Sequence, residues 1–175
     1  MVNSFLKPSF IFSFLLSLFL SIAVSPGSMR IVPEVDVCSK LRFPGYCANV
    51  LKLAPGADLY SLSQYTINLA HVHAFNSLTL IHNLINTTDP KLKLRYTSCS
   101  MDYNDILLCL TQAKKSCTSG DYKGMKSSAA AAIKNVRECD ANPPVDPSPL
   151  PKNNKASIKM SKIIMILADF MGGKH

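Results

Sequence analysis

Residues 99–139, CSMDYNDILLCLTQAKKSCTSGDYKGMKSSAAAAIKNVREC, begin and end with cysteine and are centred on Ser119. Apolar residues recur in steps of three and four on both sides of a Ser119-Gly120-Asp121 turn, which predicts two helices of equal length. In an antiparallel pair, residues equidistant from the turn lie opposite each other. Cys99 and Cys139 can then come within the ~4.4 to 6.8 Å between Cα atoms that a disulfide requires. The stretch therefore predicts a helical hairpin closed by a Cys99–Cys139 disulfide.

The same helical spacing continues on both sides of this hairpin. One helix is expected from Asp58, its N-cap, to Asn86, and another after the proline-rich linker 141–151. Four amphipathic helices with a short connection between the middle pair predict an all-α, up-down-up-down four-helix bundle. The four apolar stripes are Ile67, Ala70, Ala74, Leu78, Ile81, Ile85; Cys99, Tyr103, Ile106, Leu110, Ala113, Cys117; Met125, Ala129, Ala132, Val136, Cys139; and Ala156, Met160, Ile163, Leu167, Phe170.

A second cysteine pair, Cys38 and Cys47, precedes the bundle. On one straight helix nine steps of ~1.5 Å would separate their backbones by about 13 Å, too far for a disulfide. The chain must fold back between them, and we expect the turn at Phe43-Pro44-Gly45. Residues 31–54 are therefore predicted to form a small helical hairpin clipped by a Cys38–Cys47 disulfide and packed against the bundle.

The chain opens with the pattern of a secretory signal peptide. Lys7 precedes an apolar run over 10–24, and Ser25-Pro26-Gly27-Ser28 then breaks the helix, with cleavage expected between residues 23 and 28. The run is shorter than the ~20 residues of a spanning helix, so no stable membrane insertion is expected once it is removed. We assign 1–27 to the signal peptide and 28–175 to one domain, in which 28–57 is the N-terminal hairpin and 58–175 the bundle.

Cysteine usage and charge fit an extracellular location. The even number of cysteines suits an oxidising compartment, and Asn86-Thr87-Thr88 predicts a glycosylation site at Asn86. Cys109 and Cys117 lie about 12 Å apart on one helix, so they are expected to be two buried thiols, with an intermolecular bridge as the alternative. The net charge of +8 favours acidic polysaccharide, an acidic protein or an anionic membrane as partner, or only a solvated basic surface, and nucleic acid is not expected outside the cell.

Candidates for catalysis are few. His71 and His73 point to different helix faces, and His82 has no carboxylate nearby in sequence. Asp102 and Asp105 lack a partner constellation, and no phosphate loop, nucleophile elbow, metal motif or cofactor motif is found. The sequence therefore favours a rigid binding protein, not an enzyme, with no catalytic residue, cofactor or metal.

The chain resembles the plant invertase and pectin methylesterase inhibitors over essentially its whole mature length. The stretch from Cys38 to Cys47 fits the first family motif, two cysteines framing an aromatic-proline pair, at all but Leu41. Cys99 with Tyr103 fits the second motif, and 119–122 with the following helix to Cys139 fits the turn. The last helix of the family matches 154–170.

Two departures from the family pattern bear on packing and on the target. Asp140-Ala141-Asn142 follows the last cysteine, where the family usually has an acid and an aromatic residue. Some invertase inhibitors carry Pro-Lys-Phe in the hairpin turn, whereas this chain has Tyr122-Lys123-Gly124, so only the lysine matches. The comparison favours pectin methylesterase over acid invertase as the target.

The resemblance implies a secreted cell-wall inhibitor that covers the substrate cleft of its enzyme in a one-to-one complex. Direct binding to acidic pectin and binding to a receptor are the alternatives. Contacts with the enzyme are expected from exposed helix faces, where a rigid ring and a long cation are good anchors. The candidate contact residues are Asn104, Leu108, Thr111, Asp121, Tyr122 and Lys123.

Overall fold

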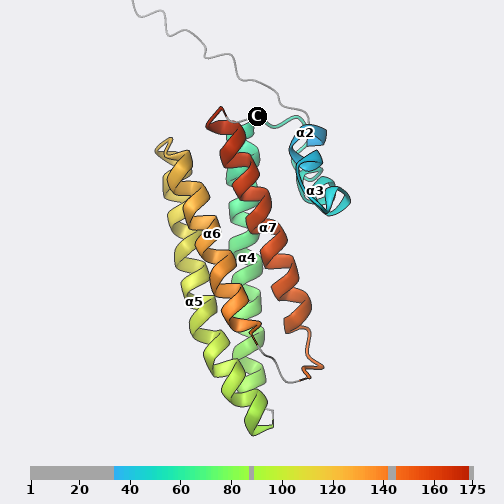
Figure 1. Ribbon diagram of the computed structural model, residues 1–175, viewed down its shortest axis with the longest axis vertical. Helices are drawn as coiled ribbons and strands as arrows, with labels where there is room; N and C mark the ends of the chain where they lie inside the picture. Colours follow the sequence, from blue (N-terminus) through green and yellow to red (C-terminus); the bar gives the residue numbers. More distant parts are fainter. Residues whose placement is uncertain (1–33, 87–88, 142–144, 174–175) are drawn as a thin grey trace, which may run out of the picture.

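A computed structural model describes residues 34–86, 89–141 and 145–173. The predicted signal peptide, the two threonines of the glycosylation sequon and Asn142 lie outside the described residues. The described part of the chain contains helices and no strand (Figure 1). In order they are α2 (Glu34–Ser39), α3 (Pro44–Leu51), α4 (Leu59–Ile85), α5 (Pro90–Thr118), α6 (Tyr122–Cys139) and α7 (Leu150–Met171).

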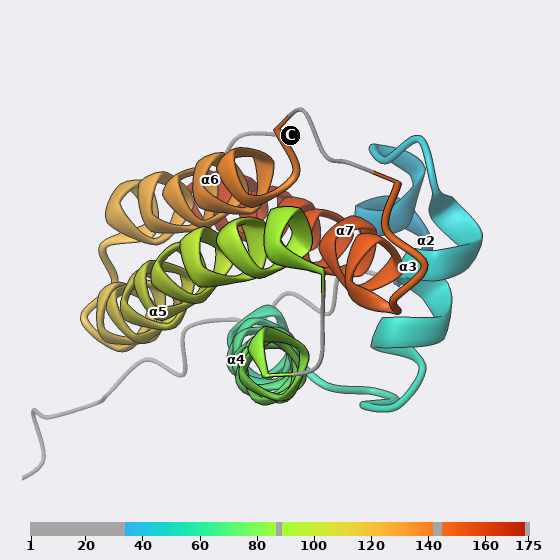
Figure 2. The ribbon, with the colours of Figure 1, turned by 90° about the horizontal axis from the view of Figure 1, so that it is seen from below.

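Helices α4 to α7 form the predicted four-helix bundle, which confirms the fold class. Each helix packs on the next, and α7 returns to pack on α4, so the four occupy the corners of a square (Figure 2). The bundle core contains nearly every residue of the four predicted stripes. Ile85 is only partly buried because it is the last residue of α4, and Ala156 because it lies beside the buried line of Asn154, Ser157 and Met160.

Local capping explains where the bundle helices begin. The side chain of Asp58 accepts a hydrogen bond from Ser61 N at 2.8 Å, as expected of the predicted N-cap, and Asp89 accepts one from Lys91 N at 2.7 Å. Helix α7 begins at Leu150, inside the predicted linker, because Pro151 in its first turn needs no amide donor there. Between the two cysteines, residues 99–118 of α5 and the 18 residues of α6 form the predicted pair of nearly equal length, but α5 has 29 residues in all. The extra turns of α5 precede Cys99, where Asp89-Pro90 starts the helix.

The N-terminal hairpin, α2 and α3, lies outside the square and packs on α7 (Figure 2). Cys38 and Cys47 are joined by a disulfide with 5.5 Å between their Cα atoms. The chain turns over residues 40–43, one step earlier than predicted, since Pro44 lies in the first turn of α3 and Gly45 is helical. Its buried side chains are Val37, Cys38, Cys47, Val50 and Leu51.

Candidate functional site

The predicted contact residues of α5 lie on its exposed face. Leu108 is 67% exposed, and Asn104 and Thr111 are exposed beside it. The side chains of Asn104 and Thr111 already donate to the carbonyls of Ser100 (2.8 Å) and Leu107 (2.9 Å) within the helix. Because those donors are satisfied locally, this face offers a partner mainly shape and apolar area.

Two further apolar side chains on α5 were not foreseen. Leu94 is 75% and Met101 64% exposed, and each lies seven residues from the next along Leu94, Met101 and Leu108. A seven-residue step turns a helix by nearly two full turns, so these side chains form one stripe along α5. The seven-residue repeat is present in the sequence, but the longer run of three- and four-residue steps on the same helix predicts only its buried stripe. We call Leu94, Met101 and Leu108 the α5 apolar stripe.

A shallow groove runs between the exposed sides of α5 and α6, next to Leu108. Thr111 lies on its α5 side, and also lines a separate depression between α4 and α5. The groove is lined by Leu108, Cys109, Thr111, Gln112, Lys115, Ser127, Ser128 and Ala131. The groove adds a concave region to the candidate contact surface, on one side of the α5 apolar stripe.

The turn residues Asp121, Tyr122 and Lys123 lie apart from that groove. They line a second hollow at the end of the bundle, opposite Ala168, Asp169 and Gly172 near the end of α7. The two regions are linked along α5, where Thr111, Lys115 and Ser119 line one further depression that reaches the turn. The candidate residues therefore form two neighbouring patches joined at the α5–α6 turn.

Within the turn the three candidates differ in what they can do. Gly120 has φ +75°, which favours glycine, and Asp121 caps α6 by accepting a hydrogen bond from Gly124 N at 2.8 Å. A Cβ on Gly124 would overlap the Asp121 carboxylate, so the glycine makes room for the cap. Tyr122 is half-buried, whereas Asp121 and Lys123 are both exposed. The carboxylate of Asp121 is engaged in the cap. Asp121 therefore has a structural role that the sequence interpretation did not assign to it.

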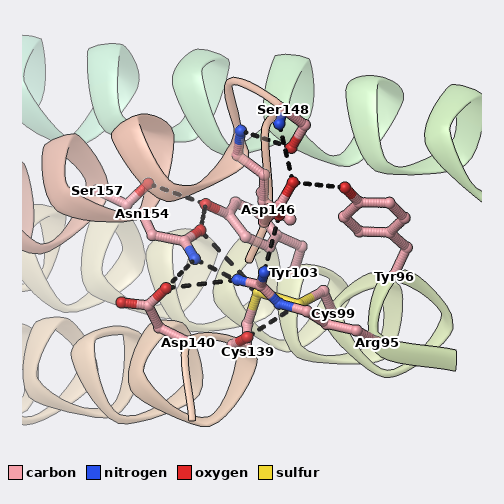
Figure 3. The surroundings of a disulfide bond; sticks show 11 residues. Arg95, Tyr96, Cys99, Tyr103, Cys139, Asp140, Asp146, Ser148, Asn154 and Ser157 are labelled. Carbon is pink, nitrogen blue, oxygen red and sulfur yellow. Dashed lines mark hydrogen bonds and ion pairs between the residues drawn. A yellow bond between two sulfur atoms is a disulfide. The ribbon is translucent and has the colours of Figure 1, made fainter. Parts of the chain in front are cut away.

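At the end of the hairpin opposite the turn, the disulfide between Cys99 and Cys139 joins α5 to α6, with 4.6 Å between the Cα atoms. Figure 3 shows polar side chains from α5, α7 and the linker converging around it. Tyr103 Oη donates to Asn154 Oδ1 at 2.8 Å, and Asn154 Nδ2 donates to Asp140 Oδ1 at 3.2 Å. The network connects the two cysteine-bearing helices to the beginning of α7.

A buried ion pair holds the linker against α5 in the same region (Figure 3). Arg95 Nη1 lies 2.8 Å from Asp146 Oδ2, and the two side chains are 7% and 2% exposed. Tyr96 Oη donates to Asp146 Oδ1 at 2.7 Å, and Ser148 N donates to the same oxygen at 2.9 Å. Burial alone would raise the pKa of Asp146, but the hydrogen bonds from Tyr96 and Ser148 and the charge of Arg95 lower it overall. No periodic pattern of residues predicts this contact, because it depends on an irregular linker.

The structure brings together no catalytic constellation among the described residues. His73 Nε2 lies 3.1 Å from the Asn153 carbonyl oxygen, and His82 Nε2 lies 2.9 Å from Ser100 Oγ, so each has its own separate partner. Cys99, Asp102 and Cys139 lie close together, but the two sulfurs are bonded to each other and cannot bind a metal as thiolates.

The two remaining cysteines are free thiols that differ in burial. Cys117 is buried in the core, as predicted, whereas Cys109 is partly exposed at the α5–α6 groove. The prediction of burial for Cys109 was wrong because it lies beside the core stripe, where α6 covers it only in part. Burial, followed by the charge of Asp105, raises the pKa of the Cys109 thiol, which disfavours the reactive thiolate.

None of the helices in the described ranges is long and apolar enough to cross a bilayer. Comparison with known proteins gives a consistent assignment. Residues 35–167 match the family model for plant invertase/pectin methylesterase inhibitors. A pectinesterase inhibitor from Actinidia deliciosa is 33% identical over 165 residues, which cover 86% of this chain and 88% of that protein. Pectinesterase inhibitor 2 from Arabidopsis thaliana is 32% identical over 142 residues, covering 77% and 82%.

The fold comparison agrees with the sequence comparison. The crystal structure of a mutant form of a pectin methylesterase inhibitor from Arabidopsis has a TM-score of 0.70 at 26% identity, covering 78% of this chain and 95% of the other. A second Arabidopsis pectin methylesterase inhibitor structure has the same fold, with a TM-score of 0.63. These proteins are inhibitors, not enzymes, and the chain belongs to the plant invertase/pectin methylesterase inhibitor family.

Proposed function

We propose that this protein inhibits a plant pectin methylesterase by covering the substrate cleft of the enzyme in a one-to-one complex. The relatives named above are pectinesterase inhibitors that align over most of the chain. The observation that carries the proposal is the α5 apolar stripe, in which three large side chains are 64–75% exposed on one rigid helix. Exposed apolar side chains that gather on one face mark interaction surfaces more often than scattered ones do.

We propose that the stripe supplies the centre of the contact and that polar residues supply its rim. Leu108 lies where the stripe meets the α5–α6 groove, so it is the expected anchor. Asn104, Thr111 and Lys123 are exposed around it or at the adjacent turn and would set orientation. Tyr122 would contribute its exposed edge, whereas Asp121 would act through the shape of the turn, because its carboxylate caps α6.

The test is inhibition of a purified pectin methylesterase by the disulfide-bonded chain 28–175, at mildly acidic pH. We expect activity to fall linearly with added inhibitor until the two proteins are equimolar. Leu108→Asp should weaken inhibition by about tenfold or more, since a central apolar anchor is worth about 1 to 4 kcal/mol. Val72→Asp, a change of another exposed apolar residue on α4, is the matched control. Equal inhibition by both variants would exclude the α5 stripe as the contact surface.

Acid invertase belongs in the same assay as the alternative target of this family. Lys123 is the one residue of the turn that matches the invertase-directed motif. Inhibition of invertase alone would reassign the target, and inhibition of neither enzyme by folded protein would contradict the proposed function.

We propose that the protein works outside the cell, in the cell wall, after residues 1–27 have been removed. Asn86 is exposed at the end of α4, and its side-chain amide makes a long contact of 3.5 Å with the His82 carbonyl oxygen. That position would admit a glycan without disturbing the bundle core. Intact-mass measurement of secreted protein before and after enzymatic deglycosylation tests both the cleavage site and the modification. An unmodified mass would contradict glycosylation at Asn86.

A further inference from the structure

Helix α7 carries a line of lysines on the side that does not face the bundle core. Lys152, Lys155, Lys159 and Lys162 follow one another in steps of three, four and three residues. At ~1.5 Å per residue they are spaced about 4.5, 6 and 4.5 Å along the axis, and the line is about 15 Å long. Lys152 and Lys155 are exposed, and Lys159 and Lys162 are partly exposed. We call these four residues the α7 lysine stripe.

Acidic side chains do not neutralise this stripe. The one acidic residue of α7, Asp169, is paired with Lys126 of α6 at 2.7 Å. Within the described ranges, none of the four lysines forms an ion pair. In the adjacent hairpin, two acids, Glu34 and Asp36, are balanced by two bases, Lys40 and Arg42, so the hairpin adds no net negative charge. The stripe therefore keeps an uncompensated positive charge.

The N-terminal hairpin extends the stripe with an aromatic edge. Lys159 Nζ lies 4.9 Å from the centroid of the Tyr46 ring and 5.7 Å from that of Phe43. Both rings are partly exposed and meet edge to face, with 6.1 Å between their centroids. A line of cations beside aromatic rings combines two features that suit an acidic sugar: charge for its carboxylate and an apolar ring surface for its C–H face.

We propose that the α7 lysine stripe binds a linear polyuronate, the de-esterified form of pectin. A polyuronate chain carries a carboxylate on every sugar, and a straight row of ammonium groups matches such a linear array of charge. An anionic membrane fits less well, since membrane-surface helices combine basic residues with large apolar side chains that insert. The exposed large apolar side chains of the described chain lie elsewhere, and none lies on α7.

The position of the stripe allows it to act together with the proposed inhibitor surface. Helices α5 and α7 each pack on α4 and α6, so they occupy diagonal corners of the bundle (Figure 2). The stripe can therefore bind polymer while the α5 apolar stripe contacts the enzyme. If the proposed function holds, the inhibitor would be retained where the esterase has already produced free carboxylates. Polymer binding itself does not depend on inhibition.

The test is binding of the disulfide-bonded chain 28–175 to immobilised polygalacturonate in the absence of any esterase. The stripe variant is Lys152→Gln/Lys155→Gln/Lys162→Gln, which spares Lys159 because it contacts the hairpin. The matched control is Lys91→Gln/Lys93→Gln/Lys134→Gln, which removes the same charge from exposed positions on α5 and α6. Fully methyl-esterified pectin and vesicles containing anionic lipid are the comparison surfaces.

We expect the stripe variant to lose about tenfold or more in affinity for polygalacturonate at low salt, and the control variant less than about threefold. Aligned charges can contact one polymer chain at the same time, whereas scattered charges attract it separately and weakly. Neither protein should bind the esterified polymer, and both triple variants should still inhibit the enzyme. Equal losses in the two variants would overturn the proposal in favour of nonspecific charge attraction. Equally tight binding to anionic vesicles, or no binding to polygalacturonate, would also overturn it.

Discussion

Two helical hairpins in this protein are closed by disulfides, and the closures differ in what they hold. Cys99–Cys139 closes a hairpin whose cysteines are 40 residues apart, and Cys38–Cys47 closes one whose cysteines are 9 residues apart. The first hairpin, α5–α6, forms half of the bundle. The second, α2–α3, is attached to the side of α7 (Figure 1).

The comparison separates covalent closure from packing. In the chain-entropy description, a loop of 40 residues gives about 4 kcal/mol and a loop of 9 residues about 2.5 kcal/mol, so the longer loop gains more from its disulfide. The surroundings of the two bonds differ as well. The α5–α6 disulfide lies within a polar network that reaches α7. The α2–α3 hairpin instead joins the apolar core through a few buried side chains, and Lys159 of α7 contacts two of its aromatic rings. The same bond therefore stabilises the bundle in one place and an appended module in the other.

Removing each disulfide in turn is the strongest test of this difference. We expect Cys99→Ala/Cys139→Ala to lower the free energy of unfolding by about 4 kcal/mol, and Cys38→Ala/Cys47→Ala by about 2.5 kcal/mol. Alanine avoids burying a new hydroxyl group at these positions. Urea unfolding followed by circular dichroism measures both changes. Cys109→Ala, at a free and partly exposed thiol, is the control, and equal losses for the two pairs would contradict the comparison.

Breaking the ion pair between Arg95 and Asp146 should cause the next largest loss of stability. Among the described residues, the N-terminal hairpin has no buried ion pair of this kind. Arg95→Met would leave a buried carboxylate without its cation, and we expect a loss of about 3 kcal/mol in unfolding free energy. Arg137→Met, on the exposed side of α6, should cost less than about 0.5 kcal/mol.

Adding Asp146→Asn to the Arg95 variant should restore part of the loss, because the uncompensated charge is then gone. The readout is again the midpoint of urea unfolding. If Arg95→Met and Arg137→Met unfold at the same urea concentration, the ion pair does not hold the linker to α5.

The regular parts of the fold were accessible from the sequence because their signals are periodic. The buried stripe from Cys99 to Cys117 and that from Met125 to Cys139 predicted the central hairpin, and every residue in both stripes is buried. The extension of α5 before Cys99 was not predicted. The start of α7 at Leu150 was missed because the prolines of 141–151 were assigned to a linker, whereas Pro151 lies in the first turn of the helix.

The candidate site was harder to predict because its surface depends on what neighbouring helices leave uncovered. The sequence identified Leu108 but not its partners Leu94 and Met101, and it treated Asp121 as a contact residue although the carboxylate caps α6. The ion pair between Arg95 and Asp146 joins a helix to an irregular linker 51 residues away, and no local sequence pattern predicts such a contact.

The smallest expected effect concerns the α5–α6 hairpin alone: its stability should depend on pH through a carboxyl group beside the disulfide. Asp102 follows Cys99 by one helical turn, and its Oδ2 is buried without a hydrogen-bond partner. Burial, then the charges of Glu138 and Asp105, raises the pKa of this carboxyl above its usual 3.8. The folded state therefore binds the proton more tightly than the unfolded chain, so stability falls as pH rises from about 4, the unfolded value, through the higher folded pKa.

Asp102→Asn removes the charge and keeps the shape of the side chain. We expect a higher melting temperature than that of the parent protein at pH 7 and almost no difference at pH 3, where the carboxyl is protonated in both states. Asp36→Asn, at an exposed carboxylate of α2, is the control and should change neither value appreciably. A gain at pH 3 as large as that at pH 7 would mean that side-chain shape, not charge, limits packing beside the disulfide. A lower melting temperature at pH 7 would mean that the ionised carboxylate stabilises the α5–α6 hairpin, and the sign argued from its burial would be wrong.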